Sequence, residues 1–369
     1  MNKKNIWIFS SVIDNFGDAG VAYRIAREIS LNKEFKIFLF IDDIITLAKL
    51  ENSLSLQHQK QIRHNIIIIQ WNSSCFSGLA TPDIILETFG CFSEKPLNNQ
   101  KLESIPQINI EYLSAEDWTL NYHLKPSLLG TQKKFFYFLG FNENSGGLFI
   151  ENNYTQEEME FKKHDTNILN FVQKYKIPFN LKRKKIFIFG YESNIWHQWT
   201  NIWRQLNINY ELWIAEKKVL NSMRENRIHT VSLPFVNQTD FDKLLWLSDI
   251  AIVRGEDSFI RAQLAGIPFF WHIYPQKNQL HLKKLSAFWC QVTPYYENEI
   301  FFHHQRLSLA LNEGIVLSDK ECYTSWNILL QYQENWLKNT QSWRDFLLSQ
   351  STAYEKLTQF IKKQLELPL

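Results

Sequence analysis

The stretch WIFSSVIDNFGDAGVAYRIAREI, residues 7–29, has the pattern of a buried strand, a polar turn and a helix. Residues 7–12 are mostly apolar, residues 14–20 are polar and contain two glycines, and residues 21–29 carry apolar side chains at helical spacing. A strand that leads through a short turn into a helix is the repeating element of a parallel α/β sheet. We therefore expect residues 7–12 to form the first strand of such a sheet.

The same alternation of strand and helix continues along the chain and restarts once. Further strands are expected at residues 35–41, 66–71, 82–87, 108–112, 186–189, 210–214, 228–233, 250–253 and 268–273. Helices are expected at 44–49, 194–205, 241–247 and 259–265 and in the tail from about residue 325, and a loop is expected at 137–151. Isoleucine-rich strands with helices between them predict parallel, doubly wound sheets.

We expect two domains, because 369 residues exceed the usual length of one. A basic run at residues 182–185 marks the boundary, so the first domain is residues 1–182 and the second is residues 183–345. A solvated linker explains this run more simply than a nucleic-acid patch does. The predicted fold class is α/β with GT-B architecture, in which two Rossmann-like domains face each other across a cleft and a C-terminal helix, residues 346–369, packs back on the first domain. Non-enzymatic binding proteins share this arrangement, so it does not fix the function.

Composition excludes several classes of protein. The 40 Lys and Arg residues balance 38 Asp and Glu residues to a net charge of +2, so we expect no nucleic-acid partner. No apolar run approaches the roughly 18 residues of a membrane helix, so we expect no membrane association. The cysteines have no CxxC spacing, which favours free thiols in the cytoplasm over disulfides or a zinc site. They are Cys75, Cys91, Cys290 and Cys322.

The first polar segment whose side chains could carry out chemistry is residues 14–20, DNFGDAG, between a strand and a helix. It lacks the GxGxxG pattern of a dinucleotide site, although ligands of α/β sheets bind at such turns. Asp14 and Asp18 could be structural caps of the turn and the helix. Two carboxylates would repel a phosphate, so the functional alternative is a catalytic base.

The second polar segment is Arg254-Gly255-Glu256-Asp257-Ser258, again between a strand and a helix. Backbone N–H groups at the helix start could bind a phosphate, with the Ser258 hydroxyl beside them and the charge of Arg254 added. An ordinary capping box with an ion pair is the structural alternative. The density of polar groups at one strand end favours the functional interpretation.

Aromatic residues form a third group, at strand and loop ends of the second half. Tyr191 follows the strand at 186–189, and Phe241 begins a helix close to Gln238. A planar base that stacks on such rings gains about 1–3 kcal/mol for each stacking side chain. Phe189 alone would be a core residue, whereas the loop positions of Tyr191 and Phe241 favour a base-binding pocket.

Five segments resemble the EarP family of arginine rhamnosyltransferases, which modify translation elongation factor P in some bacteria. The segments are residues 12–18 (VIDNFGD), 111–118 (EYLSAEDW), 146–148 (GGL), 244–263 and 271–276 (WHIYPQ). The resemblance spans most of the chain and is densest around RGEDSFIRAQ, residues 254–263. Leu264 stands where family members often have Trp, and Phe16 stands where Tyr is common.

This resemblance implies an inverting transferase that moves L-rhamnose from dTDP-β-L-rhamnose to one arginine in a loop of elongation factor P. The acidic catalytic residues of the family correspond to Asp14, Asp18 and Glu256. Its nucleotide pocket corresponds to Phe189, Tyr191, Gln238 and Phe241, and its diphosphate element to Arg254, Gly255, Asp257 and Ser258, with Tyr274 nearby. We assign three neighbours of the acidic pair to substrate binding as well, namely Asn15, Phe16 and Gly17.

The chemistry of the residues agrees with this implication. A guanidinium is a poor nucleophile, so it needs a carboxylate such as Asp18 to orient it and take a proton. A helix N-terminus and Arg254 can stabilise the leaving nucleotide, so we expect neither a cofactor nor a metal. We expect the first half to supply most of the acceptor surface. The alternatives are a GT-B transferase with another sugar or acceptor, and a non-catalytic module that binds the elongation factor or a nucleotide.

Overall fold

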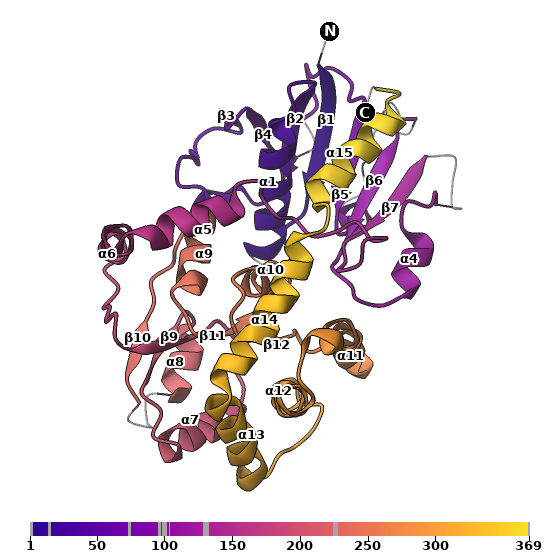
Figure 1. Cartoon of the computed structure of the whole chain (residues 1–369). Helices are drawn as coiled ribbons and strands as arrows, with labels where there is room; N and C mark the ends of the chain where they lie inside the picture. Colours follow the sequence, from indigo (N-terminus) through magenta and orange to yellow (C-terminus); the bar gives the residue numbers. More distant parts are fainter. Residues whose placement is uncertain are drawn as a thin grey trace. The chain divides into compact units, whose positions relative to one another are not determined.

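The protein divides into two compact units, which Figure 1 shows in the colours of the sequence. The computed structural model describes residues 3–13, 16–72, 75–94, 97, 102, 104–127, 133–223 and 228–367. The first unit comprises Met1–Asn152 and Gln350–Leu369, and the second comprises Asn153–Ser349. Within the described residues, no helix has the length and apolar character needed to cross a membrane.

A seven-stranded sheet forms the centre of the first unit, in the order β3-β4-β2-β1-β5-β6-β7. Its pairings are parallel except that between β3 and β4. The strands are β1 (Lys4–Ser10), β2 (Phe35–Ile41), β3 (Lys60–Arg63), β4 (Ile66–Gln70), β5 (Ile84–Thr88), β6 (Gln107–Glu111) and β7 (Lys134–Phe138). Because parallel strands share a direction, the carboxyl ends of β1, β5 and β6 lie at one edge of this sheet.

Alternation of side chains sorts the apolar residues of this sheet between its two faces. Trp7 and Phe9 of β1 lie on one face with Phe38 and Phe40 of β2, and these rings belong to one buried cluster with Trp71. The residues between them in sequence are also buried and face the other way, since successive side chains of a strand point to opposite faces. Both faces are therefore covered, as is typical of parallel sheets.

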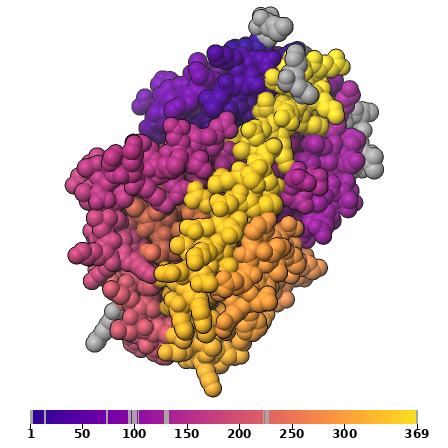
Figure 2. Space-filling model, viewed as in Figure 1, coloured from indigo at the N-terminus to yellow at the C-terminus, as the bar shows by residue number. Residues whose placement is uncertain are grey.

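Five helices belong to the first unit among the described residues, and the C-terminal one returns to it from the end of the chain. They are α1 (Phe16–Ser30), α2 (Ile44–Leu50), α3 (Cys91–Glu94), α4 (Trp118–Tyr122) and α15 (Ala353–Gln364). The rings of Phe135 and Phe360 meet edge to face with their centroids 5.3 Å apart, and Lys362 forms an ion pair with Glu34. Figure 2 shows this yellow C-terminal segment on the surface of the first unit, beside its indigo and magenta residues.

The second unit has a five-stranded parallel sheet in the order β10-β9-β8-β11-β12. Its strands are β8 (Lys184–Ile188), β9 (Tyr210–Ile214), β10 (Thr230–Ser232), β11 (Ile250–Arg254) and β12 (Phe269–His272). The chain runs outward from β8 to β10 and then returns to the other side of β8. This is the strand order of one Rossmann half, and the reversal between β8 and β11 is its topological switch point.

The helices of the second unit fill the connections between strands and the segment after β12. They are α5 (Tyr154–Lys163), α6 (Asp165–Lys174), α7 (Ile195–Gln205), α8 (Lys217–Met223), α9 (Gln238–Trp246), α10 (Asp257–Leu264), α11 (Leu280–Val292), α12 (Asn298–Leu311), α13 (Asp319–Gln331) and α14 (Gln333–Leu348), with 3-10 turns η3 (Lys277–Gln279) and η4 (Thr293–Tyr295). Buried tryptophans pack several of them together: Trp199 and Trp203 of α7 meet Trp326 of α13 edge to face.

The boundary between the units lies earlier than the predicted 182/183, because α5 and α6 pack on α9 of the second unit. The Tyr154 hydroxyl accepts a hydrogen bond from the indole of Trp246 at 2.9 Å, and Lys174 forms an ion pair with Asp240 at 2.6 Å. Within the basic run, Lys182 and Lys184 are exposed, but Lys185 is buried and donates to the carbonyl oxygens of Asn180 and Arg183.

Two strands and several helix starts differ from the expectations. Helices α9 and α10 begin at Gln238 and Asp257, before the expected starts at residues 241 and 259. Strands β3 and β7 were not predicted, and β7 reaches into the segment expected to be a loop. Helix α1 begins at Phe16 and not at residue 21, so Gly17 and Asp18 lie in its first turn. The two glycines of DNFGDAG suggested a longer turn, but tertiary packing overrides the weak helix propensity of glycine.

Acid should destabilise the second unit through His304. This ring is fully buried, accepts a hydrogen bond from Trp336 at 3.1 Å and lies 2.7 Å from the carbonyl oxygen of Phe269. Burial lowers its pKa from 6.5 to about 3, so the folded protein holds it neutral while the unfolded chain takes up a proton. The stability contributed by the neutral ring is fully present above about pH 6.5 and is lost progressively toward about pH 3.

Denaturant unfolding between pH 4 and 6.5 measures this linkage as a slope of the unfolding free energy against pH. His304→Gln should reduce the slope by up to about 1.4 kcal/mol per pH unit, the value for one proton. His58→Gln is the control, because His58 is exposed. An unchanged slope in His304→Gln would contradict the assignment.

Candidate functional site

Asp18 lies beside the carboxyl end of β1, buried in the first turn of α1 with 3% of its surface exposed. Its Oδ2 accepts a hydrogen bond from the Ile13 backbone N–H at 2.9 Å. Asp18 therefore ties the strand-to-helix connection together from inside the first turn of α1, and not as the helix cap that the structural alternative assumed. A carboxylate is also favoured near the positive end of the helix. Phe16 is half-buried and Gly17 is exposed, whereas Asp14 and Asn15 lie outside the described residues.

Asp42 secures the same connection from the neighbouring strand. It follows β2 directly, accepts a hydrogen bond from the Val12 N–H at 2.9 Å and accepts another from the Ser11 hydroxyl at 2.6 Å. The sequence analysis did not single out Asp42, although its position directly after a predicted strand was a signal that could have found it. Residues 11–13, which follow β1, are thus held by two carboxylates.

In the second unit, the switch point between β8 and β11 brings Phe189 and Arg254 together. The backbone N–H of Phe189 donates to the Ile252 carbonyl oxygen at 2.8 Å, which extends the pairing of β8 with β11. The guanidinium carbon of Arg254 is 4.5 Å from the ring centroid of Phe189 and 4.9 Å from that of Tyr191. The rings expected to stack on a base therefore contact the guanidinium in this structure.

Tyr191 is held in place by His272, the last residue of β12. The Tyr191 N–H donates to His272 Nδ1 at 3.2 Å, and the two rings meet edge to face at 5.3 Å. Burial, with a smaller contribution from the charge of Arg254, lowers the pKa of His272 to about 4, so the ring is neutral near pH 7. Tyr274 is 65% exposed, and its ring meets that of Tyr191 edge to face with the centroids 5.6 Å apart.

Gly255 and Glu256 connect β11 to α10, and the helix begins at Asp257, two residues earlier than the expected start at residue 259. Gly255 has φ of +71°, and the Trp271 indole donates to its carbonyl oxygen at 2.8 Å. The first backbone N–H groups of α10 follow at once, at a helix end that favours negative charge. The Ser258 hydroxyl donates to the Arg254 carbonyl oxygen, so its proton is engaged within the protein.

Charged groups around Glu256 and Arg254 come from elements that the sequence did not connect with this site. Lys284 of α11 lies 3.9 Å from Glu256 Oε1, and Glu216 lies 3.4 Å from the Arg254 guanidinium. Asp257 is the first residue of α10 and is half-buried. No local pattern identifies Lys284 or Glu216, because each reaches the site from a helical or loop segment distant in sequence.

Gln238 and Phe241 both lie at the start of α9. Gln238 is 8% exposed, and Phe241 contacts the end of β8 through Phe187 at 5.7 Å and Phe189 at 6.1 Å between ring centroids. Asn237 caps this helix by accepting from the Asp240 N–H. Phe241 thus contacts Phe189, which in turn contacts Arg254. Arg254 and Tyr274 both contact Tyr191, so the five side chains form one group.

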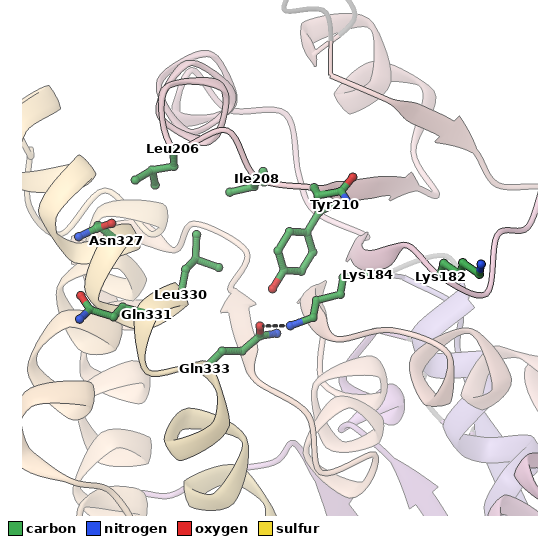
Figure 3. A pocket seen from close by; sticks show the side chains of 10 residues that line it. Lys182, Lys184, Leu206, Ile208, Tyr210, Asn327, Leu330, Gln331 and Gln333 are labelled. Carbon is green, nitrogen blue, oxygen red and sulfur yellow. Dashed lines mark hydrogen bonds between the residues drawn. The ribbon is translucent and has the colours of Figure 1, made fainter.

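A separate hollow in the second unit, shown in Figure 3, is not part of this group. Its volume is about 580 Å³, and its lining includes Lys184, Tyr210 and Gln333. Lys184 and Tyr210 begin strands β8 and β9, so the hollow lies at the amino-terminal edge of the sheet, opposite to the switch point. The Lys184 ammonium donates to Gln333 Oε1 at 2.5 Å, drawn as a dashed line.

Side chains of the metal-ligating types do not cluster in the described part of the chain. None of its His, Cys, Asp and Glu side chains form a group of three or more that could hold a metal ion. The cysteines, which were expected to be free thiols, are free.

Comparison with known proteins agrees with the architecture and the motifs. Residues 6–362 match the family described as Elongation-Factor P (EF-P) rhamnosyltransferase EarP. The protein-arginine rhamnosyltransferase of Neisseria meningitidis serogroup B is 36% identical over 97% of both chains. That of Shewanella oneidensis is 30% identical over 96% of this chain and 97% of its own.

Solved structures show the same fold at lower identity. One, described as the structural basis for EarP-mediated arginine glycosylation of translation elongation factor EF-P, aligns with a TM-score of 0.66 at 21% identity, over 98% of this chain and 99% of that one. The glycotransferase of kitacinnamycin aligns with a TM-score of 0.57 at 10% identity over the whole of both chains. The fold is therefore the α/β fold of GT-B glycosyltransferases. With the family match over nearly the whole sequence, the chain belongs to the EarP family and is a glycosyltransferase of the protein-arginine rhamnosyltransferase type.

Proposed function

We propose that this enzyme transfers L-rhamnose from dTDP-β-L-rhamnose to one arginine side chain of elongation factor P in the cytoplasm. The observation that carries the proposal is the contact of Arg254 with Phe189 and Tyr191 at the switch point of the second sheet. Ligands of doubly wound sheets bind at such points, outside the carboxyl ends of the strands. The protein described for the related solved structure acts on an arginine of EF-P, which supports the same acceptor here.

The second unit is suited to a nucleoside diphosphate. Phe189, Tyr191 and Phe241 offer aromatic surfaces for a planar base, and Gln238 carries an amide that can both donate and accept. The start of α10 and the guanidinium of Arg254 can meet the negative diphosphate, as anions are favoured at helix N-termini. We propose that the incoming donor draws Arg254 from the rings toward the diphosphate, which frees the rings for the base.

Asp18 is proposed as the base that orients the acceptor guanidinium and accepts its proton as the C–N bond forms. For this step, the segment that carries Ile13 must move, because Asp18 is 3% exposed in this structure. Glu256 would orient the sugar, and Asp14 would support the loop. A single displacement from the opposite face then inverts the anomeric centre, with the departing charge stabilised by Arg254 and α10 and without a metal.

Intact-mass analysis of elongation factor P tests the function directly. Incubation with dTDP-β-L-rhamnose and this enzyme should add one deoxyhexose, and an Arg→Lys change in the acceptor loop should abolish the gain. A gain only from another nucleotide sugar, or on another protein, would indicate a different GT-B transferase. Binding of the factor without any mass change would indicate a non-catalytic module.

Asp18→Asn should reduce kcat by about 10²–10⁴-fold, the usual contribution of general-base catalysis, and leave the Kd for dTDP almost unchanged. The amide keeps the shape of the side chain and can still accept from the Ile13 N–H, but it cannot take a proton. Asp83→Asn is the matched control, because Asp83 also accepts a backbone N–H, from Asn5 at 2.8 Å, but beside the amino end of β1. A mutant that keeps its rate and loses only thermal stability would make Asp18 a structural cap.

Phe241→Ala should weaken dTDP binding by about 1–3 kcal/mol through lost stacking, as measured by calorimetry. Phe189→Ala should have a similar effect, but Phe189 also contacts Arg254, so Phe241→Ala is the cleaner variant. Phe302→Ala, which removes a ring that is 52% exposed on α12, should leave the affinity unchanged. Wild-type affinity in both ring variants would assign Phe189 and Phe241 to the core.

A further inference from the structure

The segment that follows β6 carries exposed aromatic rings and carboxylates that the proposed donor site does not use. Tyr112 is 40% exposed and Trp118 is 49% exposed. Three carboxylates, of Glu111, Glu116 and Asp117, share the same eight residues. We call residues 111–118 the β6 edge.

The β6 edge lies at the same end of the first sheet as Asp18. The order β1-β5-β6 is parallel, so the carboxyl ends of the three strands follow one another along that end. Neighbouring strands are about 4.8 Å apart, which places the end of β6 roughly 10 Å from the end of β1. An extended arginine side chain spans a large part of that distance, so one acceptor loop can contact both places.

Tyr112 packs on Phe89, a residue whose backbone conformation is strained. Its ring stacks on Phe89 with the centroids 4.3 Å apart and the planes 8° from parallel. Phe89 has φ of +56°, a left-handed conformation that is unusual and unfavourable for a bulky residue. The Phe89 N–H donates to the Ile110 carbonyl oxygen at 2.8 Å, which ties this strained turn to β6. Strain of this kind gathers where a site is held in a defined shape.

The charge of the β6 edge is negative. Among the described residues, no Lys or Arg lies within ion-pair distance of Glu111, Glu116 or Asp117. Burial and the buried carboxylate of Glu87 raise the pKa of Glu111, and the charge of Lys134 offsets them only in part, so a further cation beside Glu111 would relieve an unfavourable charge. Neighbouring carboxylates and an aromatic face together favour a cationic ligand.

We propose that the β6 edge positions the acceptor arginine, with the guanidinium stacked on Tyr112 and the carboxylates of Glu111 and Glu116 beside it. This inference rests on the proposed function, because it takes an arginine-bearing protein loop as the occupant. A planar guanidinium stacks on an aromatic face and pairs with carboxylates at its edges, which a lysine ammonium does less well. Tyr112 is therefore a positioning residue that selects arginine and leads it to Asp18.

Steady-state kinetics with elongation factor P as the varied substrate tests the proposal. Tyr112→Leu should lower kcat/KM for the factor by about 3- to 30-fold, mainly through KM, the range expected for a cation–π contact. Tyr112→Phe keeps the ring and should stay within about twofold of the wild type. The Kd for dTDP and the thermal unfolding midpoint should be unchanged in both, which separates positioning from a structural role.

Tyr323→Leu is the matched control, because Tyr323 is 38% exposed but lies on α13 of the second unit. A Tyr112→Leu enzyme with wild-type kcat/KM would overturn the inference, as would an equal loss in Tyr112→Phe, which would point to the hydroxyl. If the wild-type enzyme itself transfers no deoxyhexose to the factor, the proposed function fails. Direct binding of the factor then decides the β6 edge separately: weaker binding by Tyr112→Leu alone supports it, and equal binding overturns it.

Discussion

The hydrogen bond from the Phe189 N–H to the Ile252 carbonyl oxygen is the contact on which the proposed donor site depends. It carries the pairing of β8 with β11 one residue beyond β8 and thereby sets Phe189 beside Arg254. The guanidinium then rests on two rings whose backbones are fixed by the sheet and by His272. A register shift of one residue would turn each side chain to the opposite face and disperse the group. The order and register of the strands thus determine which side chains meet at this site.

His272 belongs both to the core of the second unit and to the site. The ring is buried, holds the Tyr191 N–H with Nδ1 and lies against Trp196. Its lowered pKa keeps it uncharged next to Arg254, so it adds no positive charge that would repel the guanidinium. Gly190 permits this close packing, because a Cβ there would come within 2.7 Å of the Trp196 ring and 3.2 Å of His272 Nδ1. The turn after β8 therefore tolerates no side chain at its centre.

The pattern of the sequence predicted the ten strands that carry the fold, because buried parallel strands are continuous apolar runs. It missed β3, whose residues are largely polar at the sheet edge, and β7, whose last two residues were assigned to the loop expected at residues 137–151. It placed polar groups correctly at strand ends, but not their partners. Glu216 and Lys284 reach Arg254 and Glu256 from distant segments, and such pairs follow only from the tertiary fold. Asp42 and His272 also lie at the ends of predicted strands. The expectation that polar residues at strand ends form sites would have identified both if it had been applied to every strand.

The two sheets use one geometrical principle with different charged groups. In each unit the carboxyl ends of parallel strands collect polar side chains at one edge. The second unit offers Arg254 and the N-terminus of α10 there, with Glu216 and Glu256 paired to Arg254 and Lys284, whereas the first offers Asp18, Asp42 and the carboxylates of the β6 edge. A diphosphate is stabilised by the former and a guanidinium by the latter. Because a guanidinium reacts only when a carboxylate orients and deprotonates it, an acidic acceptor edge is a chemical requirement. In the proposed mechanism, the carboxylates of the first unit would repel the nucleotide, whereas Arg254 and the N-terminus of α10 in the second unit would attract it, so charge would help to direct each substrate to its own unit.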